Sequence, residues 1–443
     1  MKMLGILLLL VLSSNAAEYE GECKSGWPLV PRPHSVSVLE FGAVGDGITD
    51  NTLAFQNAIF YLKSFADKGG AQLYVPEGHW LIGCINLTSH LTIFLEKDAV
   101  ILGSQVDIFM CKIFTNVQFE LWESSSFHTH CTLTLQDYSH WDVVESLPSY
   151  GQGLEVPGQR YRSLISGQNL TDVVITGNNG TIDGQGMLPL SVSECSNVLV
   201  QNITIYSPSY SPYTSGIVPD SSEHVCIENS NISVGHDAVV LKSGWDEYGM
   251  AYGKPTTNVH VRNVRLQSFA GSGVAFGSEM SGGISSILVE HIHVHDSQVG
   301  IELKTAVGRG GYMTDISISD TVMDNVQQGI KATGHCNSHP DNKFDPQALP
   351  VVSDIRFKNI LGSNITSAGK FFGIDRSPFT SICLSNVSFY LNSDPTTSWK
   401  CLNVLGSSFD VSPMPCPELL SSASSSFLDC FVFPHPSSRV AYL

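Results

Sequence analysis

The feature that most constrains this chain of 443 residues is a short motif repeated through its middle and C-terminal parts. Each copy has a polar lead-in, a short alternating run rich in β-branched residues, a polar residue that is usually Asn, and a second short run. The copies begin at residues 170, 195, 222, 256, 284, 313, 352 and 379. A spacing of roughly 25 to 39 residues is typical of solenoid repeats.

The runs are too short for helices and alternate with a period of two, so each repeat predicts two or three short strands separated by turns. Stacked repeats of this kind form a right-handed parallel β-helix, in which each coil covers the apolar face of the previous one. A β-sandwich would place hairpin signals such as Asn-Gly between the runs, and the regular spacing does not fit it. We therefore predict an all-β fold, a single parallel β-helix.

The chain departs from the repeat before the first coil. Residues 41–65 begin with a glycine-rich turn, after which Asp50 or Asn51 can cap a helix. We expect this helix to close the first coil. The apolar face that would cover the coil carries Leu53, Ala58 and Tyr61 or Leu62.

The N-terminal residues have the order of a secretory signal peptide. Lys2 precedes the apolar stretch Leu4–Leu12 and then SSNAA, a small-residue cleavage site near Ala16 or Ala17. The stretch is shorter than the roughly 20 residues of a membrane span. We predict a signal peptide over 1–17, a β-helix over 35–405 and a Ser- and Pro-rich tail over 406–443.

Two further features fit an extracellular protein. The chain has 11 cysteines, an odd number that leaves at least one unpaired, and we expect Cys416 and Cys430 to tie the tail by disulfides. It also has seven Asn-x-Ser/Thr sequons, which are acceptors for N-linked glycans. The sequons lie at Asn86, Asn169, Asn179, Asn202, Asn231, Asn364 and Asn386.

The formal net charge of −18 argues against a nucleic-acid partner, whose phosphates need a basic face. It does not exclude an acidic substrate, because charges on the surface are screened beyond about 8 Å at physiological salt. A local group of Lys and Arg residues in a groove can therefore overrule the global sign.

The segment SVGHDAVVLKSG, residues 233–244, places His236 and Asp237 side by side after a glycine. An apolar run and Lys242 follow. From the residues alone, the pair is half of a catalytic site, the remnant of one, or a surface pair.

Several long segments resemble the polygalacturonases of glycoside hydrolase family 28, in particular a plant branch of this pectin lyase-like group. The resemblance runs from about residue 35 to 405. It is carried by FGAVGDGITDNT, GNNGTIDGQG, PDSSEHVCIENSNISVGHDAVVLKSGWDEYG, GSEMSGGISSILVEHI and GIELKTAVGRGGY. The resemblance implies the β-helix fold and hydrolysis of α-1,4-galacturonan, the acidic backbone of pectin, with inversion. Inversion needs a carboxylic acid on one side of the glycosidic bond and a carboxylate about 6.5–9.5 Å away that activates water.

The family's site motifs are altered in this sequence. Where the family has Asn-Thr-Asp-Gly the chain reads YTSG, so Ser215 replaces an aspartate. The paired aspartates read GHD, with His236 in place of the general acid and Asp237 retained. Gly-His-Gly reads GSG, and Arg-Ile-Lys reads ELK, so Glu302 replaces the arginine and Lys304 remains. The family's further coil after TIDGQG is also missing, through evolution or through a gene-model error.

By the resemblance, Asp237 is a candidate general base that helps to orient the attacking water; the alternative is a turn carboxylate that accepts backbone hydrogen bonds. An imidazole with the ordinary pKa of about 6.5 is largely protonated at mildly acidic pH. His236 can therefore donate a proton to the leaving oxygen or bind a uronate, or it is a non-catalytic partner of Asp237. Ser215 cannot act as a base without a neighbour, and losing one member of a catalytic set commonly costs several orders of magnitude in rate.

Lys304 and Arg309 are candidate cations for uronate carboxylates; the alternative for both is a solvated turn charge. We expect Glu302 to neutralise part of the Lys304 subsite. We interpret Glu279 as a turn residue. His291, His293 and His295 are expected on one outer strand face, where three imidazoles rarely form a zinc site, so we predict no metal and no cofactor.

Three functions remain open. The first is a secreted monomeric hydrolase of polygalacturonate in the cell wall, without nucleic-acid or membrane partners. The second is a pectin-binding or regulatory protein that kept the groove and lost turnover. The third is a lyase, which would need clustered carboxylates for calcium and a basic arginine, and the sequence has no such cluster.

Overall fold

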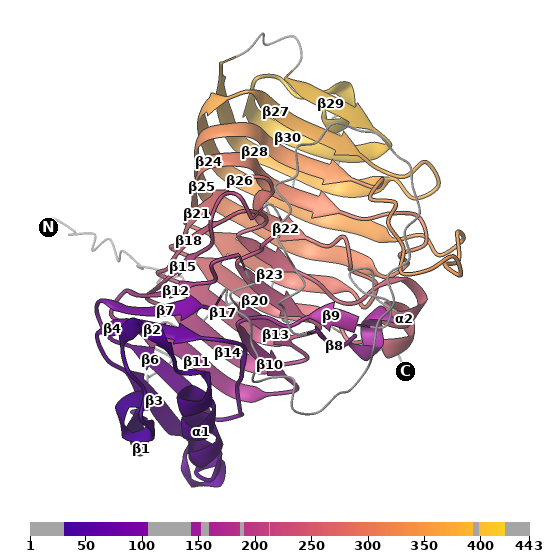
Figure 1. The fold of residues 1–443 in the computed structure, drawn as a ribbon. Helices are drawn as coiled ribbons and strands as arrows, with labels where there is room; N and C mark the ends of the chain where they lie inside the picture. The colour runs from indigo at the N-terminus through magenta and orange to yellow at the C-terminus, as the bar shows by residue number, and fades with distance from the viewer. Residues whose placement is uncertain are drawn as a thin grey trace, which may run out of the picture.

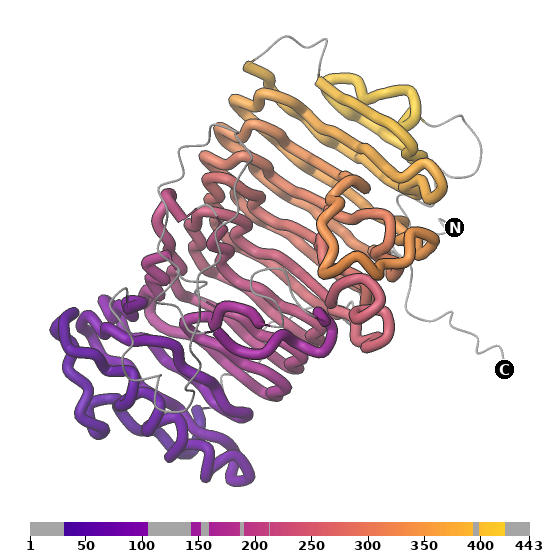
Figure 2. The backbone as a smooth tube through the Cα atoms, turned by 45° about the vertical axis from the view of Figure 1, so that its right-hand side comes forward, coloured from indigo at the N-terminus to yellow at the C-terminus, as the bar shows by residue number. Residues whose placement is uncertain are grey.

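The computed structural model describes residues 31–104, 143–151, 159–186, 190–211, 213–392 and 398–420. In this part of the chain, 28 strands form one continuous sheet whose pairings are all parallel. The chain winds into a right-handed parallel β-helix, seen as stacked coils from the indigo to the yellow end in Figure 1 and Figure 2. The predicted all-β solenoid is confirmed.

Each coil contributes strands to three faces. Face 1 contains β5 (Ile85–Asn86), β10 (Ile165–Gln168), β13 (Leu190–Ser193), β16 (Ile217–Asp220), β19 (Val239–Leu241), β22 (Ser272–Phe276), β27 (Ser367–Phe372) and β29 (Trp399–Leu402). Face 2 contains β1 (His34–Ser37), β3 (Ala71–Val75), β6 (Leu91–Leu95), β11 (Thr171–Gly177), β14 (Ser196–Gln201), β17 (Glu223–Glu228), β20 (Thr256–Arg262), β23 (Ile284–Glu290) and the first part of β30 (Val404–Ser412). Face 3 contains β2 (Asp46–Asp50), β4 (Gly78–Ile82), β7 (Ala99–Gly103), β12 (Gly180–Asp183), β15 (Ile203–Tyr206), β18 (Asn231–Val234) and β21 (Arg265–Ser268).

Four long strands bend through more than one face. β24 (His293–Lys304) runs through faces 3 and 1, and β25 (Tyr312–Thr333) runs through all three. β26 (Val351–Ile365) and β28 (Phe379–Leu391) run through faces 2 and 3. The coil region ends with β30 at Ser412, past the expected boundary at 405.

The interior is built from identical positions of successive repeats. The first apolar residue of each run pairs in register with its counterpart in the next coil, and all are at most 2% exposed. This stack consists of Val173, Val198, Val225, Val259, Ile287, Ile316, Ile355 and Ile382. β-branched side chains suit such stacking because their stiff χ1 fits a pleated surface.

The polar residue between the two runs of a repeat makes the bend between faces 2 and 3. At these bends Asn202, Asn229, Asn263, Asp320, Asn359 and Asn386 have φ between 49 and 54°. Asn and Asp tolerate this left-handed conformation better than other non-glycine residues. Their side chains also stack: the Asn359 amide donates to Asp320 Oδ1 at 2.9 Å, and the Asn386 amide donates to Asn359 Oδ1 at 2.9 Å.

The predicted cap helix is present as α1 (Thr52–Lys63) at the indigo end in Figure 1. It packs on the first coil through Phe55, Ala58, Ile59 and Leu62. Leu53 was assigned wrongly to this face, since it is 61% exposed, and of the alternatives Tyr61 and Leu62 only Leu62 is buried. The period of 3.6 fits 55, 58, 59 and 62 better than a face that includes 53.

The remaining short elements lie outside the main sheet. They are η1 (Val38–Phe41), η2 (Ala66–Lys68), η5 (Pro148–Tyr150), α2 (Asp246–Tyr252), η7 (Pro417–Leu419) and the antiparallel hairpin of β8 (Val143–Glu145) and β9 (Gln159–Tyr161). None of the helices in the described ranges has the length and apolar composition needed to cross a membrane.

The pairing of the cysteines is partly as expected. Cys416 forms a disulfide with Cys401 of the last coil, so the start of the tail is tied to the β-helix. Cys195 and Cys336 have free thiols, which confirms that the odd set leaves cysteines unpaired. Residues 1–17 and Cys430 lie outside the described residues.

The missing coil leaves no gap in the sheet. β10, β11 and β12 pair directly with β13, β14 and β15, so the coils on either side of the shortened segment stack in register.

Candidate active site

The candidate site residues gather on face 1 because consecutive coils stack them. Ser215 precedes β16, and His236 and Asp237 precede β19 on the next coil. The His236 amide donates to Thr214 O at 2.9 Å, and the Gly216 amide donates to Asp237 O at 2.9 Å. Ser215 therefore lies beside the His236–Asp237 pair.

Asp237 is the centre of this cluster. Its Oδ1 accepts the backbone N–H of Ser272 at 2.9 Å, and its Oδ2 lies 2.6 Å from Lys304 Nζ and 3.3 Å from His236 Nδ1. Its side chain is only 3% exposed, whereas that of His236 is 34% exposed. Burial alone would raise the pKa of Asp237, but Lys304 and His236 outweigh it and hold that pKa far below its usual range.

Lys304 is held in its charged form by the same contact. Burial would lower the pKa of Lys304, but Asp237, with Glu302, raises it above its usual value. The ammonium group already has a buried counterion, and its side chain is 15% exposed. Lys304 therefore positions Asp237 and keeps it ionised. A uronate bound here would have to share the Lys304 ammonium group with Asp237.

Glu302 was expected to neutralise the Lys304 subsite, but its direct partners are different. Its Oε2 accepts the Ser272 hydroxyl at 2.5 Å, and its Oε1 lies 2.6 Å from Lys331 Nζ. Lys331 occupies the position next to Glu302 on the following coil. Its ammonium, rather than Lys304 alone, balances the charge of Glu302.

Lys331 begins a row that the sequence reasoning missed. In register on successive coils of face 1, Glu302 is followed by Lys331, Lys370 and Lys400. The shared GI in GIELK and GIKAT, 29 residues apart, was the signal that could have aligned the first two. We call Lys331, Lys370 and Lys400 the lysine row.

Arg309 is not on the groove surface. It is 0% exposed, its Nη1 pairs with Asp246, and its Nε and Nη2 donate to Ser278 O at 2.8 Å and Ser338 O at 2.7 Å. The guanidinium also lies 5.4 Å from the ring centroid of Trp245. The prediction that Arg309 binds a uronate is corrected: its donors are used inside the protein, where it anchors α2.

A second ionic cluster lies one coil from Asp237. Asp220 is 4% exposed, accepts the Tyr150 phenol and accepts the Ser221 hydroxyl at 3.0 Å. Burial raises the pKa of Asp220 above its usual value. Lys242 lies 3.4 Å from Glu279, which sits in the turn between β22 and β23 as interpreted from the sequence.

The three histidines of EHIHVHD do not share one strand face. His291 is a left-handed turn residue with φ 52°, and only His293 and His295 lie in β24. His293 pairs with Asp324 at 3.0 Å and His295 with Asp296 at 3.0 Å. In the described part of the chain, the one group of three potential metal ligands contains Cys401 and Cys416, whose sulfurs are joined in a disulfide.

The molecule is thus a parallel β-helix that carries a buried carboxylate, an imidazole and lysines on one face. The sequence profile described as "Glycosyl hydrolases family 28" matches residues 187–412, and the profile "Rhamnogalacturonase A/epimerase, pectate lyase-like" matches residues 35–146. A "Probable polygalacturonase" of Vitis vinifera is 39% identical over 94% of this chain and 87% of its own length. The chain therefore belongs to glycosyl hydrolase family 28.

Solved structures agree on the fold. An exopolygalacturonase from Thermotoga maritima superposes with a TM-score of 0.64 at 22% identity, covering 86% of this chain and 91% of that one. A polygalacturonase from Erwinia carotovora gives a TM-score of 0.55 at 18% identity, covering 84% and 96%.

Proposed function

We propose that this protein is a secreted, monomeric hydrolase of α-1,4-galacturonan in the pectin of the cell wall, with an altered catalytic set. The observation that carries the proposal is the lysine row, which follows Glu302 on the face that holds Asp237, in a chain whose net charge is −18. Cations gathered on one face of an acidic protein suit a polyanionic polymer. The family, and the polygalacturonases among its relatives, support the same substrate class.

The chemistry follows from the site's charges. His236, when protonated, donates its proton to the leaving oxygen, and Asp237, kept ionised by Lys304 and His236, orients and polarises the attacking water. The two groups are in contact at 3.3 Å, whereas the acid and base of inverting glycosidases are about 6.5–9.5 Å apart. The partly exposed His236 ring must therefore turn away from Asp237 when a sugar enters.

The same features limit the rate. A carboxylate whose pKa is held low by Lys304 is a weak proton acceptor, and Ser215 supplies no second carboxylate. We expect turnover well below that of a site with three aspartates.

The reaction class is tested by incubating the purified protein with polygalacturonate. New reducing ends without ultraviolet absorption are expected from hydrolysis. A product that absorbs in the ultraviolet, because it contains a new double bond, would establish a lyase instead.

A second function, pectin binding without turnover, is favoured by the enclosure of Asp237, whose two oxygens are both bonded to protein groups. Under this alternative the groove is intact and only acid and base are missing. The double change Ser215→Asp and His236→Asp should then raise hydrolysis sharply. Equal activity before and after the change, or failure to retain pectin oligomers, would count against it.

A further inference from the structure

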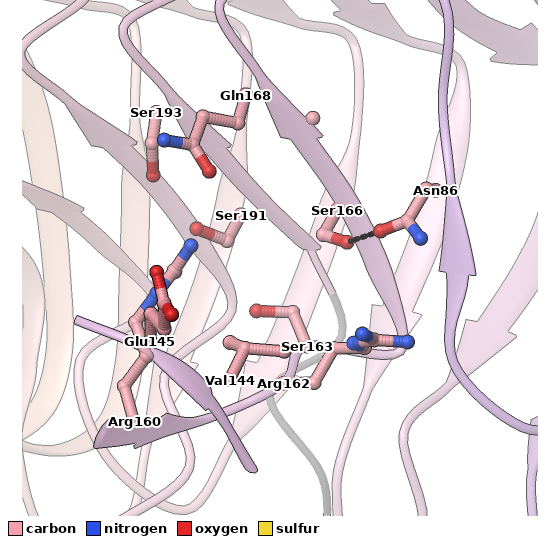
Figure 3. Close-up of a pocket in the computed structure, with 11 residues that line it drawn as sticks. Asn86, Val144, Glu145, Arg160, Arg162, Ser163, Ser166, Gln168, Ser191 and Ser193 are labelled. Carbon is pink, nitrogen blue, oxygen red and sulfur yellow. Dashed lines mark hydrogen bonds between the residues drawn. The ribbon is translucent and has the colours of Figure 1, made fainter. Parts of the chain in front are cut away.

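A cavity of about 330 Å³ lies on face 1, before the coils that hold Asp237 (Figure 3). Its floor comes from β5, β10 and β13, where Asn86, Ser166 and Ser191 occupy one register row. The β8–β9 hairpin supplies Arg160 and Glu145. The volume is at the lower end of the roughly 300–1,000 Å³ found for ligand pockets.

Two residues that line this cavity each have a buried polar atom without a partner among the described residues. Ser163, which is 2% exposed, has no hydrogen bond to its Oγ, and the Nε of Arg160 is buried without an acceptor. Both residues line the cavity. Buried donors are paired in the great majority of cases, so two orphans in one cavity indicate a missing ligand with acceptor oxygens.

The lining matches an acidic sugar. Arg160 and Arg162 give two positive charges and Glu145 one negative charge, so the described lining carries a net charge of +1. A guanidinium binds a carboxylate through paired hydrogen bonds. Hydroxyl groups of Ser163, Ser191 and Ser193 can exchange hydrogen bonds with sugar hydroxyls.

The cavity is close enough to Asp237 for one polymer to occupy both. Ser193 of β13 pairs with Asp220 of β16, and Asp220 forms a bridge with Lys242 just after β19. The floor at β13 is therefore two coils from β19, which Asp237 precedes, or about 10 Å at the usual strand spacing.

We propose that this cavity is a subsite for one hexuronate unit of the substrate chain, bound through Arg160 and Ser163. This assignment rests on the proposed galacturonan substrate. It places sugar units on the N-terminal side of Asp237, opposite to the lysine row.

The test uses galacturonate trimers and pentamers with the full chain. In the wild type, KM should fall as the substrate lengthens from trimer to pentamer. We define the chain-length gain as the KM for the trimer divided by the KM for the pentamer. In Arg160→Gln this gain should fall by at least tenfold, and in Ser163→Ala by a smaller factor. Arg265→Gln, the same charge change on the exposed start of β21, is the matched control and should keep the wild-type gain.

Calorimetric binding of the pentamer is measured in parallel, before and after removal of N-linked glycans because Asn86 is a sequon, and thermal melting verifies that each variant folds. Arg160→Lys, which keeps the charge, replaces Arg160→Gln in the test if the glutamine variant does not fold. It should retain part of the affinity. Equal pentamer affinity and chain-length gain in the wild type and the Arg160 and Ser163 variants would overturn the subsite while leaving galacturonan hydrolysis in place. A wild type that neither binds nor cleaves the oligomers would overturn the proposed function and the subsite with it.

Discussion

At the scale of residues, the site depends on an ion pair rather than on a free acid and base. Lys304 keeps Asp237 charged inside the protein, and Asp237 keeps Lys304 charged in return. The resemblance predicted that Ser215, His236, Asp237 and Lys304 belong to one site, because each lies within a recognisable family motif. It could not predict that Arg309 is buried, because its partner Asp246 lies 63 residues earlier and only the fold joins them.

Replacing Lys304 by Gln should destabilise the protein, because it leaves Asp237 buried without its main counterion. We expect the free energy of unfolding to fall by about 3–5 kcal/mol, the usual cost of breaking a buried pair. Denaturant unfolding measures the change. Lys343→Gln, at a more exposed lysine, is the control, and an equal, small effect of both changes would contradict the importance of the pair.

The difference in the free energy of unfolding between the wild type and Lys304→Gln should depend on pH. Asp237 has a depressed pKa in the folded state, so its stabilising contribution is present above its unfolded pKa of about 4 and is lost as pH falls further. The two proteins should therefore differ by a nearly constant amount from pH 7 to 5 and converge below pH 4. Thermal melting across this range checks it; a difference that grows on acidification would be inconsistent with an ionised Asp237.

At the scale of elements, one coil is explained by its repeat. The β-branched runs become strands, and the Asn or Asp between them bends the chain in the left-handed conformation. These are local signals, which is why the fold was predictable. The pairing of Glu302 with Lys331 was not, because it depends on the register between coils 29 residues apart.

Asn359 provides a test of the bend. Asn359→Ala loses the side-chain bonds to Asp320 and Asn386 and strains a backbone with φ 53°, whereas Asn359→Gly loses only the bonds. The alanine variant should be less stable than the glycine variant by about 1–2 kcal/mol. Denaturant unfolding of the two side by side measures this. If alanine is as stable as glycine, the conformational argument is wrong.

At the scale of the whole molecule, the charges are distributed unevenly. The lysine row continues from Glu302 toward the C-terminal coils, while the chain as a whole is acidic. Composition alone gave the sign of the net charge but not this local reversal, because Lys331, Lys370 and Lys400 become neighbours only when the coils stack.

Reversing two of these charges should weaken polygalacturonate binding. We expect Lys370→Glu with Lys400→Glu to lower the affinity about tenfold or more at low salt, and by less at high salt, because salt screens surface charges. The control, Lys63→Glu with Lys68→Glu, makes the same net change at the exposed end of α1 and η2. Affinity on immobilised polygalacturonate measures both, and equal losses would mean that only the net charge matters.

The most direct measurement is the rate of release of reducing ends from polygalacturonate by the wild type and by Asp237→Ala, with the folded fraction of each protein measured in the same samples. A hydrolase that uses Asp237 to orient water should release reducing ends slowly but measurably, and the alanine variant should lose at least 100-fold of that rate. An unchanged rate in Asp237→Ala, with both proteins folded, would contradict the account.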